Sequence, residues 1–146
     1  MKVSRRMDKQ LKSKTSQTGA IGEDIACTFL VRKGFKIIEK NYRKPWGEID
    51  VIAEKNGVIH FVEVKAVSRS LQPNDSRENI SREMDYRPEE MATKAKLHKV
   101  VRTATLYMEY KKDDREFQVD VLGVLMDKEK RIARCRFFEQ ALASNS

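Results

Sequence analysis

An Asn-Gly dipeptide at residues 56–57 separates two segments in which apolar and polar residues alternate. These segments are GEIDVIAE at 47–54 and VIHFVEVKA at 58–66. Alternation with a period of two is typical of β-strands. Asn and Gly both tolerate the positive φ that a two-residue type I′ turn requires. The sequence therefore predicts a β-hairpin in which the numbers of paired residues add up to 113.

Patterns on either side of this hairpin predict the other elements. Apolar residues recur at helical spacing in two segments, 18–34 and 88–112, and Gly34 is well placed to end the first helix. Three further strands are expected, at 35–42, 117–126 and 132–138. The polar stretch 67–87 predicts a mobile loop. The order α-β-β-β-α-β-β indicates an α/β domain with a central mixed sheet flanked by helices.

The length of 146 residues fits one folded domain. We expect this domain at 18–140, a disordered basic tail at 1–17 and a short C-terminal tail at 141–146. Residues 1–18 contain six basic side chains and one acid, so they account for most of the net charge of +8. Charge alone therefore does not indicate a nucleic-acid partner, because a basic tail is also common as a solubilising end.

Other features of the composition indicate the reducing environment of the cytoplasm. No segment has the apolar core of a signal peptide or the length of a membrane span, which predicts a cytoplasmic protein with no membrane partner. Cys27 and Cys135 lie in apolar segments without metal-binding spacing, so both are expected to be free thiols.

The hairpin register brings acidic residues together. Asp50 is expected directly opposite Glu63, with Lys65 on the same face of the sheet, while Ile49 and Val51 point to the other face. Like charges placed this way repel each other. One interpretation is a sheet rim of surface ion pairs. The other is that the two carboxylates and the carbonyl of the intervening residue bind Mg²⁺ or Mn²⁺, ions that prefer oxygen ligands.

GEID at 47–50 followed by FVEVK at 61–65 resembles the PD-(D/E)XK nuclease signature. The wider chain is similar to the YraN family of uncharacterised bacterial proteins. The motifs that carry this similarity are TGAIGEDIACTFLVRKGFKIIEKNYR (18–43), GEIDVIA (47–53), FVEVK (61–65), RPEEMATKAK (87–96) and VDVLGV (119–124). The resemblance implies a restriction-endonuclease-like fold close to that of Holliday-junction resolvases.

The resemblance also implies an activity and the residues responsible. Asp50, Glu63 and Lys65 match the metal-binding and catalytic positions, and Glu23 matches an additional acid that completes the metal site in resolvase-like members. The implied activity is Mg²⁺- or Mn²⁺-dependent hydrolysis of phosphodiester bonds in DNA rather than RNA, with branched or damaged DNA among the substrates. A homodimer is one arrangement that the resemblance suggests.

Basic residues of the second expected helix are candidates for binding nucleic acid. Lys96 matches a recurring lysine of the family, and Lys94, Lys99 and Arg102 lie near it in the sequence. Arg69 could supply a basic contact where the family often has one two residues earlier. A solvated helix face explains the same basic run.

Two other functions remain open at this point. A nucleic-acid-binding module of the same fold would bind without cleaving, and a protein-interaction module would use the loop and tail for a protein partner. Asp120, inside an apolar strand, is expected to form a structural ion pair or to act as a cap rather than to act in catalysis. Tyr42 and Trp46 flank the GEID segment and are expected to make hydrophobic packing contacts rather than to stack on bases.

Overall fold

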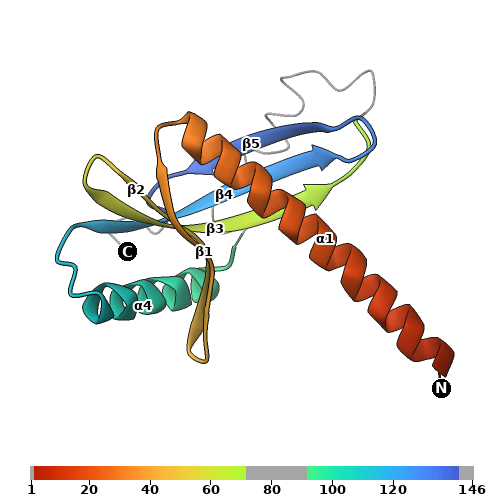
Figure 1. The fold of residues 1–146 in the computed structure, drawn as a ribbon, viewed down its shortest axis with the longest axis horizontal. Helices are drawn as coiled ribbons and strands as arrows, with labels where there is room; N and C mark the ends of the chain where they lie inside the picture. The colour runs from red at the N-terminus through yellow and green to blue at the C-terminus, as the bar shows by residue number, and fades with distance from the viewer. Residues whose placement is uncertain (1, 72–91, 142–146) are drawn as a thin grey trace.

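The computed structural model describes residues 2–71 and 92–141, with side chains from Gln17 onward. It confirms the expected α/β fold, a mixed sheet flanked by helices in the predicted order (Figure 1). The elements are α1 (Lys2–Arg32), β1 (Lys36–Lys44), β2 (Gly47–Lys55), β3 (Val58–Ser68), α4 (Lys94–Tyr110), β4 (Phe117–Asp127) and β5 (Ile132–Phe138).

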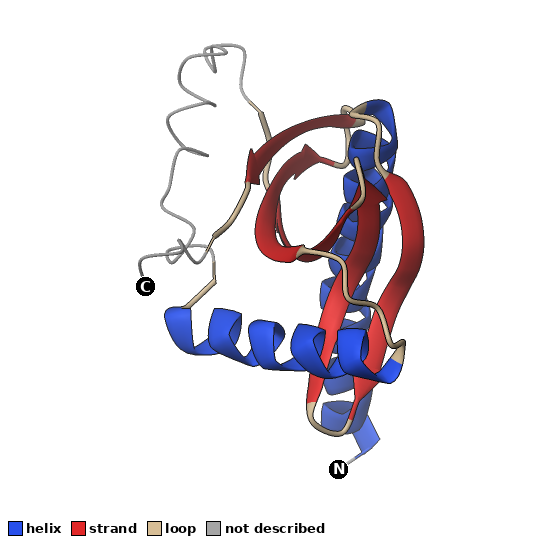
Figure 2. Cartoon of the chain, turned by 90° about the vertical axis from the view of Figure 1, so that its left-hand side faces the viewer, coloured by secondary structure: helices blue, strands red, loops and turns tan. Residues whose placement is uncertain are grey.

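The five described strands form one sheet in the order β1-β2-β3-β4-β5. The central pair β3 and β4 is parallel, and the other neighbours are antiparallel. Helix α1 covers one face of the sheet and α4 the other (Figure 2). A separate hydrophobic core fills each interface, so the fold has three layers. Cys27 and Cys135 border the α1-side core as free thiols, as predicted.

The predicted hairpin is confirmed in turn and register. Asn56 has a φ of 51° and Gly57 a φ of 79°, as a type I′ turn requires. Pairing runs from Lys55 opposite Val58 to Val51 opposite Val62, and the residue numbers of each pair add up to 113.

Helix α1 is longer than its apolar pattern suggests. It begins at Lys2, so the structure has helix between residues 2 and 17, where a disordered tail was expected. Lys, Arg, Met, Leu and Gln in this segment are good helix formers, and no Gly or Pro precedes Gly19. The helix ends at Arg32, and Gly34 follows as the predicted stop residue, with a φ of 93°. No helix in the described part of the chain is long and apolar enough to cross a membrane.

Helix α4 begins later than predicted. Thr93 has non-helical backbone angles, and its hydroxyl accepts the Lys96 N–H at 3.1 Å, which makes it the N-cap. The helix therefore starts at Lys94 rather than at residue 88. The rest of the segment preceding it, including most of the expected loop at 67–87, lies outside the described residues.

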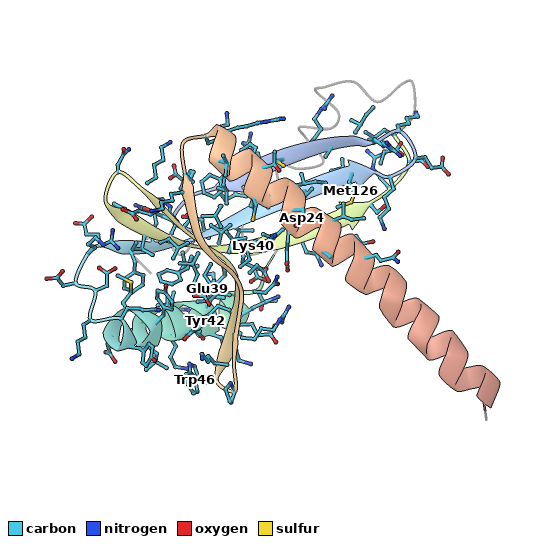
Figure 3. The ribbon with its side chains drawn as sticks, in the orientation of Figure 1. Asp24, Glu39, Lys40, Tyr42, Trp46 and Met126 are labelled. Atoms are coloured by element: carbon cyan, nitrogen blue, oxygen red, sulfur yellow. The ribbon has the colours of Figure 1, made fainter. Side chains whose placement is uncertain are left out.

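A close approach sets the position of α1 on the sheet. Gly22 faces β3, and a Cβ atom at this position would overlap the Cβ of Ala66. An ion pair between Asp24 and Lys40, 2.8 Å long, joins the same part of α1 to β1 (Figure 3). Glu23, the residue between them, faces the middle of the sheet, where it lines a cavity together with Asp50 of β2 and Glu63 of β3.

We expect Gly22→Ala to lower the free energy of unfolding by about 1–3 kcal/mol, because the added methyl overpacks the interface with β3. Gly19→Ala is the matched control in the same helix, since no atom lies within 4 Å of its added Cβ. It should raise stability by up to about 1 kcal/mol through helix propensity. Urea unfolding of both variants measures this, and equal effects would contradict the close packing at Gly22.

Candidate functional site

The strands β2 and β3 separate just beyond the pair Val51 and Val62, where their backbone ladder ends. Asp50, the residue before Val51, lies at this fork, the point where β2 and β3 separate. Its carboxylate accepts the Val64 N–H at 2.8 Å. A side chain thus replaces the backbone carbonyl that would bond this N–H in a continued ladder. The expected pair of Asp50 and Glu63 is not part of the ladder, yet the two carboxylates still interact directly.

The expectation that Ile49 and Val51 share a face is wrong. Ile49 is buried with Ile52 in the core beneath α4, whereas Val51 lies in the core beneath α1. Strict alternation cannot place residues three apart on one side, so β2 changes its facing between Ile49 and Val51. This change occurs where pairing with β3 ends, and it leaves Asp50 between the two layers.

All four residues proposed as catalytic or metal-binding line one cavity of about 520 Å³. Helix α1 contributes Glu23, β2 contributes Asp50, and β3 contributes Glu63 and Lys65. Lys96 of α4 lines the same cavity. Both flanking helices and the central hairpin therefore meet at this point.

The buried carboxylate of Glu63 is the most perturbed acid of the site. Its side chain is only 8% exposed. Burial raises the pKa of Glu63 to about 7, and the negative charge of Asp50 contributes in the same direction. A positive charge in the cavity would relieve both effects.

Lys96 supplies one such charge. Its Nζ lies 2.6 Å from Glu63 Oε1, and this contact raises the pKa of Lys96. Lys96 was expected to contact nucleic acid from the helix surface, and the structure instead brings it to the acidic cluster. Lys94, Lys99 and Arg102 are exposed on α4 and do not line the cavity.

Arg69, the remaining candidate for contact with nucleic acid, lies just beyond the end of β3. Its guanidinium donates to the Ser70 carbonyl at 3.0 Å, and its N–H donates to the Met126 carbonyl at the same distance. Arg69 does not line the cavity that holds the acidic cluster.

Glu23 reaches the cavity from the opposite layer. Burial raises its pKa, followed by the charge of Asp50, while a hydrogen bond with Asn41 lowers it. The electrostatic interaction with Asp50 shows that α1 carries a third acid toward the fork. Helical periodicity places Glu23 beside Leu30 at the edge of the apolar stripe, which allows it to face the sheet, but its role as a further acid of the site came from the family resemblance.

The acids do not form a complete metal cage by themselves. In the part of the chain with described side chains, no three His, Cys, Asp or Glu groups lie close enough to hold an ion. Mg²⁺ does not need such a cage, because it keeps several water ligands and commonly binds one or two carboxylates. Asp50 and Glu63 satisfy this smaller requirement.

A second buried carboxylate has a structural role, as predicted. Asp120 is fully buried and lies 2.7 Å from His60 Nδ1. Its other oxygen accepts hydrogen bonds from the Gln118 side chain and the Gln140 N–H. Neither His60 nor Asp120 lines the cavity, so this pair is separate from the candidate site.

The model of a known family, described as Uncharacterised protein family UPF0102, matches residues 22–124. The chain belongs to this family. A UPF0102 protein of Campylobacter fetus is 35% identical over 119 residues, which cover 82% of this chain and 93% of the relative. Similar proteins occur in Campylobacter hominis and Campylobacter lari. Each is 36% identical and covers 75% of this chain, with 85% and 84% of the respective relatives matched.

The UPF0102 match confirms the resemblance to the YraN family found in the sequence. It spans every acidic and basic residue of the cavity, from Glu23 on α1 to Lys96 on α4. The names of these relatives state no activity.

The raised pKa of Glu63 predicts a pH-dependent stability in chelator. Between pH 4.5 and about 7 the folded state binds a proton that the unfolded state has released, so rising pH removes stability across this window. Glu63→Gln should abolish this pH dependence. Between pH 4.5 and about 7, the unfolding free energy of the variant should therefore rise relative to that of wild type by up to about 3 kcal/mol.

Denaturant unfolding at several pH values measures this difference. Glu48→Gln is the control, because Glu48 is 63% exposed and paired with Arg43 on the surface. Its effect should stay within about 1 kcal/mol and change little with pH. Parallel pH profiles for wild type and Glu63→Gln would show that Glu63 titrates normally.

Proposed function

We propose that this protein is a metal-dependent nuclease that hydrolyses phosphodiester bonds in DNA. The observation that carries the proposal is the convergence of Asp50, Glu63 and Lys65 in one cavity, with Glu63 held as a buried, electrostatically strained acid. Such clusters of perturbed acids are typical of catalytic sites.

The donor set fits Mg²⁺ or Mn²⁺. Asp50 and Glu63 would hold the ion through carboxylate oxygens, and Glu23 would assist from α1, directly or through water. When bound, the ion would polarise a phosphoryl oxygen and lower the pKa of a coordinated water. Its positive charge would also offset the repulsion between the two acids.

The protein's own groups have separate roles in this proposal. The Val64 N–H donates a hydrogen bond to one oxygen of the Asp50 carboxylate and so fixes the orientation of that side chain. Lys65 is exposed on β3 and lines the cavity, so its ammonium group would stabilise negative charge on the attacked phosphate. Lys96 holds the Glu63 carboxylate in the cavity.

DNA is the proposed partner because α4, the helix that brings Lys96 to the cavity, carries further exposed cations. Lys94, Lys99 and Arg102 are exposed on α4, where they can contact phosphates. Branched or damaged DNA as the preferred substrate, and a homodimer as the acting form, are proposals that follow from the family resemblance.

A second candidate function is a nucleic-acid-binding module that does not cleave. The ion pair between Lys96 and Glu63 favours it, because that contact neutralises the buried acid without a metal. This function predicts salt-dependent DNA binding that is unchanged by chelator and by Glu63→Gln. The nuclease proposal predicts loss of activity under both conditions.

Purified protein should cleave DNA in Mg²⁺ or Mn²⁺ and be inactive in chelator. Asp50→Asn should lose both cleavage, by about 100-fold or more, and Mn²⁺ binding measured by calorimetry. Lys65→Met should lose cleavage to a similar extent but keep Mn²⁺ binding, since lysine is not a ligand in the proposal.

Glu54→Gln is the control, because Glu54 lies at the other end of β2 and pairs with Arg115. It should retain both properties. Cleavage that survives Asp50→Asn and Lys65→Met would refute the assignment of the site.

A further inference from the structure

The turn between β1 and β2 exposes the chain's only tryptophan, Trp46. Its side chain is 46% exposed at the end of the β1–β2 hairpin (Figure 3). Figures 1 and 2 both show this end projecting beyond α4. Within residues 17–71 and 92–141, no hydrogen bond or ring contact involves the indole. Trp46 is therefore not part of the hydrophobic core, contrary to the packing expected for it, whereas Tyr42 packs against the core as expected.

The hairpin holds this indole on a well-supported arm. Lys44 pairs with Gly47 across a two-residue turn. The Gly47 backbone lies so close to α4 that an added Cβ would overlap the Thr103 hydroxyl. Further along the arm, the Tyr42 ring meets Tyr107 edge to face with centroids 5.2 Å apart. A ligand that contacts the indole would therefore find it already positioned, with little ordering entropy to lose.

The surroundings of the indole are predominantly basic. Arg43 and Lys44 precede it on the arm, and Lys99 and Arg102 are exposed on the part of α4 that the arm crosses. The nearby acid Glu48 is paired with Arg43 at 2.6 Å. An exposed aromatic ring among cations is the combination that binds single-stranded nucleic acid, through base stacking and phosphate contacts.

The arm also connects the indole to the acidic cavity. Trp46 directly precedes β2, and Asp50 follows it by four residues within that strand. At about 3.3 Å per residue, their backbones are at most about 13 Å apart. A stacked strand rises about 3.4 Å per nucleotide, so this span corresponds to about four nucleotides. One strand could therefore reach both positions.

We propose that Trp46 forms a base-stacking subsite that binds an unpaired nucleobase next to the acidic cavity. The inference rests on the proposed function for the identity of the polymer. A base inside a duplex cannot present its face to the indole, so the subsite selects strands with unpaired bases. Trp46 is a binding residue that sets substrate preference and takes no part in the chemical step.

Because Trp46 is the only tryptophan, its fluorescence reports directly on the subsite. We expect a single-stranded oligonucleotide, added in chelator, to quench this fluorescence, and a blunt duplex of the same sequence to leave it nearly unchanged. Trp46→Leu should weaken single-strand binding about tenfold, whereas Trp46→Phe should stay within about threefold of wild type because it keeps a ring to stack. Anisotropy of labelled DNA measures both variants.

Several results would overturn the proposal. These are an unquenched indole while anisotropy shows DNA bound, equal affinities of the Leu and Phe variants, and absence of single-strand binding. An emission change that depends on protein concentration without DNA would place Trp46 in a self-association interface instead. Because binding is measured in chelator, this test is separate from that of the proposed function. Quenching without any cleavage in Mn²⁺ supports the subsite and refutes the nuclease. Cleavage in Mn²⁺ without quenching supports the nuclease and refutes the subsite.

Discussion

The repulsion between Asp50 and Glu63 at the fork of β2 and β3 is the constraint on which the rest of the site depends. Two carboxylates share a partly buried position, and the pKa of Glu63 rises because of burial and of its neighbour's charge. Such an arrangement costs stability unless cations or hydrogen-bond donors offset it. The Val64 N–H donates a hydrogen bond to Asp50, and the Lys96 ammonium forms an ion pair with Glu63.

The layers of the fold are arranged so that these groups can meet. Gly22 allows α1 to approach β3 closely, which brings Glu23 to the fork, and Gly47 allows β2 to approach α4 in the same way. The hairpin that carries Asp50 is thereby held between the two helices. An ion-binding or catalytic cluster benefits from this rigidity, because small displacements of the ligands weaken both binding and catalysis.

Local sequence signals predicted the parts of the structure that depend on local physics. The Asn56-Gly57 turn determined the register of β2 and β3, and apolar spacing located most of the helices and strands. Tertiary packing determined the rest. Ile49 points to the face of the sheet opposite to the one predicted, because pairing between β2 and β3 ends at the fork. The contact of Lys96 with Glu63 depends on how α4 docks after a long connection. No spacing rule could have indicated either one.

The central claim is that the Asp50 and Glu63 carboxylates hold a divalent cation. Anomalous diffraction from crystals grown with Mn²⁺ tests it most directly, with Asp50→Asn crystals as the comparison. If the two acids hold the ion, an anomalous peak lies in the cavity, about 2.1 Å from oxygens of both acids, and it disappears in the variant. Absence of a peak at saturating Mn²⁺, with Lys96 still bound to Glu63, would contradict it.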